Sequence, residues 1–96
     1  MEEVEKLLYE YSNYIFELYE DKDKFADMIV KKMIRLNDSE KYIAYVCVVT
    51  QMKGNNAEIL LRKIIQCDLL DPEILNEERT LYYDTLPGWA QDIIKN

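Results

Sequence analysis

The side chains of this sequence that could do chemistry are its carboxylates, two cysteine thiols and eight tyrosines. There is no histidine, which removes the most common general base, the most common zinc ligand and the usual pH switch near neutrality. The Glu-x-x-His pattern of di-iron helical bundles is therefore missing as well. Gly54 and Gly88 stand alone, so no glycine-rich phosphate loop is present. We expect a protein that is not an enzyme and uses no cofactor and no metal.

The acidic residues are numerous but follow no ligand pattern. Nineteen acidic and twelve basic residues give a net charge of −7. Between residues 68 and 84, six acidic residues and Arg79 give a local charge of −5, but no EF-hand spacing is present. We interpret these acids as a solvated helix face. The negative charge also argues against binding to nucleic acid or to anionic membranes, because both need Lys and Arg.

Cysteine usage and hydropathy predict a cytoplasmic protein. Cys47 and Cys67 lie in apolar stretches and are too few for a disulfide framework or a metal site, so we expect buried free thiols. The acidic N-terminal residues lack the positive segment of a signal peptide. The longest apolar run, residues 42–49, is too short to cross a bilayer.

The elements that must position these side chains are predicted to be helices. Two glycines and two prolines are too few for the turns of a β-sandwich. Apolar residues at i, i+3, i+4 and i+7 predict a first helix over residues 3–20 and a second that ends near Asn37. Eight acids and two lysines in residues 1–23 (net −6) precede four bases and one acid in residues 24–36 (net +3). An antiparallel pair of helices with complementary charge fits this pattern.

Capping signals place the later helices. Asn37 and Glu40 form a predicted capping box, and Asp71 before a proline is a strong helix start. Residues 42–49 are apolar all round and fit either a buried strand or a buried helix, and the capping box favours the helix. This helix should end at Gly54, and the next helix should be capped by Asn55 or Asn56.

We therefore expect residues 1–96 to form a single all-α domain, a compact bundle of four to five helices with antiparallel neighbours joined by short loops. The helix after Asp71 should extend to about Asp84, with Leu81 and Tyr82 on its apolar face. A last short helix should begin near Pro87. The predicted core comprises Leu7, Leu8, Tyr11, Ile15, Ile29, Met33, Ile43, Val46, Cys47, Leu60, Leu61, Ile64 and Trp89.

Two aromatic and acidic patches are candidate partner-binding sites. Tyr9 and Phe16 lie opposite the buried stripe of the first helix, between Glu5 and Glu20. Aromatic anchors with a charged rim are typical of protein interfaces. In the alternative interpretation, the C-terminal helices cover this face and make the first helix central.

The second patch is formed by Tyr82, Tyr83 and Asp84, ahead of Pro87. This short stretch resembles the tyrosine-bearing helix of nuclease-colicin immunity proteins, which are small, acidic and helical. The spacing of the other helices differs from that family. The resemblance implies that such a combination of residues can serve in a toxin inhibitor.

The function we expect is a small acidic protein–protein interaction module. It would bind and neutralise a basic protein, as inhibitors, immunity proteins and anti-defence proteins of phages or viruses do. Abundant Ile, Lys, Asn and Tyr also fit an AT-rich genome. The alternatives are a self-assembling structural or scaffold subunit, in which Tyr9 and Phe16 form a symmetric dimer seam, and a regulator whose acidic surface mimics DNA.

The first prediction concerns the patch on the first helix. Binding to a basic partner should weaken as salt concentration rises, because exposed charges are screened. The double substitution Tyr9→Ala/Phe16→Ala should abolish binding by removing both aromatic anchors. Titration calorimetry at two salt concentrations measures both effects, and unchanged, salt-insensitive binding by the double variant would contradict the prediction.

Overall fold

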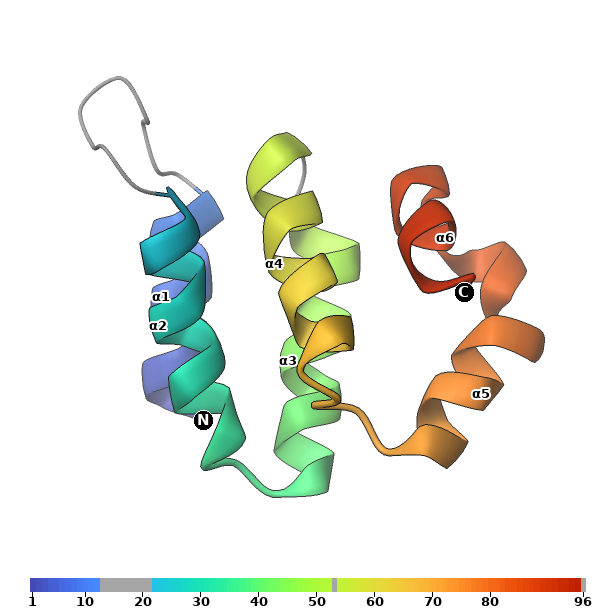
Figure 1. The fold of residues 1–96 in the computed structure, drawn as a ribbon, viewed down its shortest axis with the longest axis horizontal. Coiled ribbons are helices and arrows are strands. Elements are labelled where there is room, and N and C mark those ends of the chain that lie inside the picture. Colours follow the sequence, from blue (N-terminus) through green and yellow to red (C-terminus); the bar gives the residue numbers. More distant parts are fainter. Residues whose placement is uncertain (13–21, 53, 96) are drawn as a thin grey trace.

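The structure, a computed structural model, describes residues 1–12, 22–52 and 54–95, and in this part of the chain every regular element is a helix (Figure 1). In chain order the elements are α1 (Glu2–Ser12), α2 (Lys22–Ile34), α3 (Asp38–Gln51), α4 (Gly54–Gln66), α5 (Pro72–Thr80), the 3-10 helix η1 (Tyr83–Thr85) and α6 (Gly88–Ile94). The all-α class is confirmed.

The described part of the chain has six α-helices, more than the four to five expected. At the C-terminal end, α5 stops at Thr80 instead of continuing to about Asp84, and the last short helix, expected near Pro87, is α6. Leu86 and Pro87 then adopt extended backbone, with ψ of 148° and 151°. Because proline has no N–H to continue a helix, α6 starts separately after it.

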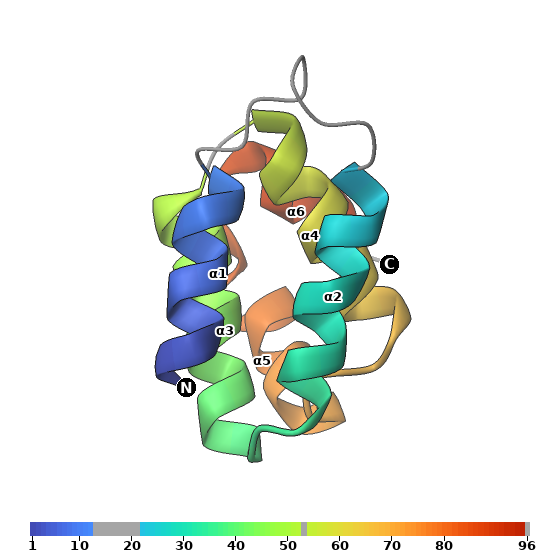
Figure 2. The same cartoon turned by 90° about the vertical axis from the view of Figure 1, so that its left-hand side faces the viewer.

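The helices lie in three neighbouring pairs (Figure 1). The pair α1 and α2 is followed by α3 and α4 in the centre, and then by α5 and α6. From the side, α1 and α2 form the front layer, with α3 and α4 behind them (Figure 2). Helix α4 contacts α1, α2, α3 and α6, whereas α5 packs chiefly against η1. The core therefore centres on α4, and α5 lies at the edge of the molecule.

Local side-chain chemistry starts α3 and α5 where the sequence predicts. The Glu40 N–H donates to Asn37 Oδ1 at 2.9 Å, and the Asn37 N–H donates to Glu40 Oε1 at 3.3 Å, which completes the capping box. Residues 42–49 lie within α3, so the helical alternative is confirmed. At the start of α5, the Glu73 N–H donates to Asp71 Oδ1 at 2.8 Å.

Most of the predicted core is confirmed, with one clear exception. The buried members are Leu8, Tyr11, Ile29, Met33, Leu60, Leu61 and Ile64. Those that are partly buried against this core are Leu7, Val46, Cys47 and Trp89. Ile15 lies outside the described residues. Ile43 is 47% exposed, and its assignment to the core was wrong. Helix α3 buries Ala44, Tyr45, Val48 and Val49 instead, and the described helices that pack against α3 leave Ile43 uncovered.

The predicted charge complementarity appears as an ion pair between α1 and α2. Lys32 Nζ lies 2.7 Å from Glu3 Oε1, and hydrogen bonding and charge from Lys32 lower the pKa of Glu3. On α4, Lys63 Nζ lies 2.9 Å from Asp27 Oδ1 and 3.9 Å from Asp23 Oδ1. Exposed pairs of this kind add little free energy each, so they orient the helices more than they stabilise them.

Asn56 joins α4 to α1 instead of capping a helix. The side chain is buried, and its Nδ2 donates to the Tyr11 backbone carbonyl at 2.7 Å. That carbonyl belongs to α1, so the hydrogen bond joins the two helices directly. The expected cap at this position was therefore wrong: α4 begins at Gly54, whose φ of +78° suits glycine.

We predict that Asn56→Ala lowers the free energy of unfolding by about 1 kcal/mol or more, because the substitution removes a buried hydrogen bond between α4 and α1. The exposed neighbour provides the matched control, Asn55→Ala, which should change the free energy by less than about 0.5 kcal/mol. Urea denaturation followed by circular dichroism measures both variants. Coincident unfolding curves for the two variants would show that this hydrogen bond does not hold α4 to α1.

Candidate functional site

The patch predicted on the first helix is described in part. Glu5 is exposed on α1, and the Tyr9 side chain is 73% exposed. The alternative in which the C-terminal helices cover this face is therefore wrong at Tyr9, because those helices lie at the far side of the molecule (Figure 1). Phe16 and Glu20 lie outside the described residues.

The second predicted patch divides into an exposed part and a structural part. Tyr82 is 45% exposed and Asp84 is exposed. Tyr83 is partly buried; its hydroxyl donates to the Gln91 carbonyl at 3.4 Å, and its carbonyl accepts from Gln91 Nε2 at 2.7 Å. Tyr83 therefore holds η1 against α6. Its neighbour Leu81, 71% exposed, belongs to the exposed part instead.

Two surface hollows lie beside this exposed segment. Their volumes are about 170 and 260 Å³, and Tyr42, Glu78 and Tyr82 line both. We call this pair of hollows the Glu78 groove. Residues of α3, α5 and η1 line it; Figure 1 shows α5 on the right of the molecule, beyond α3. The smaller hollow is also lined by Val46, Val49, Thr50, Thr85, Leu86 and Pro87, and the larger one by Ile74 and Glu77.

Glu78 is the unusual residue of the groove, because its side chain is only 4% exposed. Glu78 Oε2 accepts a hydrogen bond from the Tyr42 hydroxyl at 3.4 Å. Among the described residues, no Lys or Arg forms an ion pair with this carboxylate. Arg79, the next residue, points elsewhere and donates from Nε to the Ile94 carbonyl at the end of α6. A buried carboxylate is costly unless a charge or hydrogen bonds compensate it, and here only hydroxyls do.

The tyrosines of α3 adjoin this carboxylate. Burial, followed by the negative charge of Glu78 and a hydrogen bond to it, raises the pKa of Tyr42. Burial, together with the negative charge of Glu78 nearby, also raises the pKa of Tyr45, whose hydroxyl is fully buried and makes no well-formed hydrogen bond. The two rings lie 5.9 Å apart between centroids. Both hydroxyls therefore stay protonated near neutral pH, and the Tyr42 hydroxyl acts as a donor toward Glu78.

Sequence reasoning placed Glu78 on a solvated helix face, and this was wrong. The signal that could have found it is its spacing from Ile74 and Leu75, four and three residues earlier, which puts all three on one helix face. Leu81 and Tyr82 were expected to continue that face, but α5 ends at Thr80 and leaves both exposed.

The cysteines do not form a site. Cys47 is partly buried, and burial raises the pKa of its thiol. Cys67 is exposed, which corrects the expectation that both thiols are buried. The reason is that α4 ends at Gln66, so Cys67 falls in the turn after the helix.

Within the described ranges, no three Cys, Asp or Glu side chains gather in a way that could hold a metal ion. No described helix combines the length and the apolar character needed to cross a bilayer. No protein-family model matches the sequence, and neither a curated protein nor a solved structure shows significant similarity to the chain. The inference about function therefore rests on the residues of the groove and of its edge.

The raised tyrosine pKa values predict a loss of stability at alkaline pH. The folded protein holds the protons on Tyr42 and Tyr45 more tightly than the unfolded chain does. This contribution is fully present below the ordinary tyrosine pKa of about 10 and is lost as the pH rises through the higher folded values.

Urea denaturation of the wild type and of Tyr42→Phe, measured from neutral pH to above about pH 10, tests this expectation. Tyr42→Phe should lose less stability than the wild type over this range, whereas the control Tyr82→Phe should follow the wild type. Parallel loss in Tyr42→Phe and in the wild type would contradict it.

Proposed function

We propose that this chain is a small acidic protein–protein interaction module that binds a basic partner. The surface responsible, which we call the C-terminal binding face, consists of the Glu78 groove with the exposed side chains of Glu77, Leu81, Tyr82 and Asp84. The observation that carries the proposal is the exposure of Leu81 and Tyr82 side by side, at 71% and 45%, next to a groove in an acidic segment.

The composition of this face suits an interface. Leu81 and Tyr82 offer apolar and aromatic surface that gains about 25 cal/mol for each Å² removed from water. The acids around them would form the rim, and aromatic anchors inside a polar rim are the usual arrangement of interface hot spots. Exposed apolar surface does not stabilise the fold. It would contribute free energy when a partner covers it.

The charge of the segment favours a basic partner. Residues 68–84 carry a net charge of −5, and their one basic residue, Arg79, is engaged with the Ile94 carbonyl. Negative potential on this side would accelerate encounters with a positively charged surface and disfavour acidic ones. A partner whose working surface is covered in this way would be inhibited, which supports an inhibitor or immunity-type role as the form of this function.

A second candidate, a homodimer joined through α1, is favoured by the exposure of Tyr9. An aromatic ring that is 73% exposed on a helix face can form a symmetric seam with its copy. Light scattering separates the two candidates, because an interaction module is monomeric without its partner, whereas the seam predicts a dimer that Tyr9→Ala dissociates.

The experiment for the main proposal measures a partner's affinity for altered binding faces. A basic protein captured from cells of the source organism is identified and purified, and its binding is measured by titration calorimetry. Leu81→Ala/Tyr82→Ala should weaken binding by roughly tenfold or more, and rising salt should weaken it further. The matched control is Ile34→Ala on α2, which is also exposed and should leave affinity unchanged. Equal affinity of the double variant and the wild type would refute this binding face.

A further inference from the structure

We propose that the Glu78 groove binds an arginine side chain of the partner, with the guanidinium paired to the Glu78 carboxylate. This inference rests on the proposed function, and it names the chemical group that the C-terminal binding face recognises. It is carried by the combination of a carboxylate that is 4% exposed, its lack of a cationic partner among the described residues, and two adjoining hollows that it lines.

The first step is the electrostatic state of Glu78 in the free protein. Its hydrogen-bond partner among the described residues is the Tyr42 hydroxyl at 3.4 Å, a long hydrogen bond. Tyr45 nearby has a hydroxyl that is buried without a well-formed partner. A charge-assisted pair with a guanidinium is shorter and stronger than a neutral hydrogen bond. A cation entering the groove would therefore supply the compensation that the described fold leaves incomplete.

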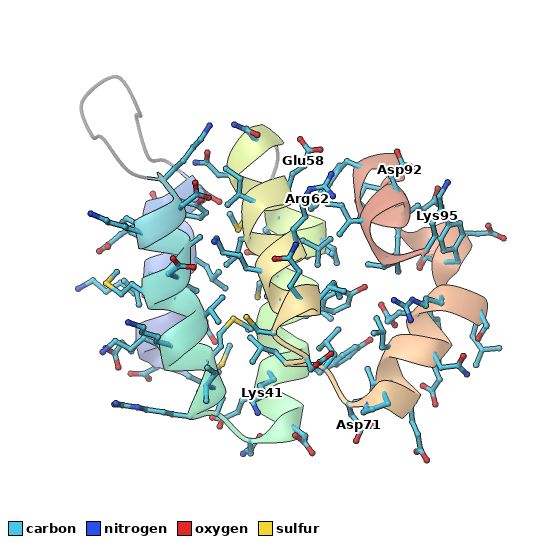
Figure 3. The ribbon with its side chains drawn as sticks, viewed as in Figure 1. Lys41, Glu58, Arg62, Asp71, Asp92 and Lys95 are labelled. Atoms are coloured by element: carbon cyan, nitrogen blue, oxygen red, sulfur yellow. The ribbon has the colours of Figure 1, made fainter. Side chains whose placement is uncertain are left out.

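The second step is that, within the described part of the chain, the bases next to the groove residues on α3 and α5 are directed or placed elsewhere. Arg79 follows Glu78 but donates to the Ile94 carbonyl. Lys41 precedes Tyr42 on α3 and does not line either hollow; Figure 3 shows it at the lower end of α3, the end at which Asp71 begins α5. Glu77 also lines the larger hollow and adds a second carboxyl group. The potential inside the groove therefore favours an incoming cation.

The third step is the match between the groove and an arginine side chain. A liquid water molecule occupies about 30 Å³, so hollows of about 170 and 260 Å³ have room for a much larger group. Val46, Val49 and Leu86 give the smaller hollow an apolar wall for the methylene groups of the side chain.

Tyr42 and Tyr82 line both hollows, and tyrosine rings attract a planar cation that stacks on them. Arginine suits this setting better than lysine, because its guanidinium is flat, weakly hydrated and able to bind a carboxylate with two donors. The groove therefore predicts a preference for arginine over lysine.

The test uses three capped amino acids as probes: N-acetylarginine amide, N-acetyllysine amide and the neutral isostere N-acetylcitrulline amide. Each is titrated into the folded, isotopically labelled protein while the NMR signals of Tyr42, Tyr82 and Glu78 are followed. The arginine probe should shift these signals saturably, with a dissociation constant on the order of millimolar, and citrulline should bind at least roughly tenfold more weakly. Lysine should lie between them. Citrulline or lysine binding as tightly as arginine would overturn the proposal.

The variants separate pairing from general attraction. Glu78→Gln keeps an oxygen that accepts from Tyr42 but removes the charge, so arginine should lose its advantage over citrulline. The control Glu77→Gln removes an equal charge from the exposed wall of the groove and should preserve most of that advantage. If Glu78→Gln does not fold, the same comparison is made with Tyr82→Ala, which should weaken arginine binding in a protein that keeps Glu78. An unchanged arginine preference in Glu78→Gln, or unchanged arginine binding by Tyr82→Ala where Glu78→Gln does not fold, would refute the assignment.

The same variants distinguish a failure of this inference from a failure of the proposed function. A basic partner that loses affinity with Leu81→Ala/Tyr82→Ala but not with Glu78→Gln would support the binding face and refute the arginine site. Arginine binding that depends on Glu78, in a protein whose partner is insensitive to Leu81→Ala/Tyr82→Ala, would support the site and refute the proposed face.

Discussion

The structure depends on the burial of one broad face of α4. The residues of this face that have no exposed surface are Ala57, Leu60, Leu61 and Ile64. A fully buried leucine or isoleucine contributes about 1.5–3 kcal/mol relative to an exposed one. Four of the other helices, α1, α2, α3 and α6, contact α4, so they are positioned by its surface. The ion pairs and caps on the periphery refine this arrangement, because each of them adds much less than the apolar burial does.

Helix α5 packs least against this core, and the candidate site lies beside α5. It packs chiefly against η1, and two polar contacts tie it to the rest: Glu78 with Tyr42 on α3, and Arg79 with the Ile94 carbonyl on α6. An apolar residue in place of Glu78 could pack directly against α3. A carboxylate there instead needs hydroxyl donors such as that of Tyr42. The groove opens at this contact.

The two acidic regions of the chain, at the N-terminal end and at residues 68–84, differ in how far bases of the fold neutralise them. In the N-terminal acidic region, Glu3 forms an ion pair with Lys32 of the same fold, at 2.7 Å. Residues 68–84 carry a net charge of −5, and their single base is turned toward α6. Negative charge that is neutralised by a base on another helix helps to orient the two helices. Negative charge beside exposed Leu81 and Tyr82 is available to a partner, which is why we place the binding face at this end.

The sequence by itself determined the features that depend on neighbours a few residues apart. The helix starts at Asn37 and Asp71 follow from side chains that reach backbone N–H groups within three residues, and the helical state of residues 42–49 follows from the first of them. The local acidic setting also marked Tyr82 as a candidate, and the structure leaves it exposed. The sequence could not place Ile43 in solvent or Glu78 in the interior, because periodicity determines which residues share a helix face but not whether another helix covers that face. Only the tertiary structure decided that, through the position of α4 beside one side of α3 and of α5 against the other.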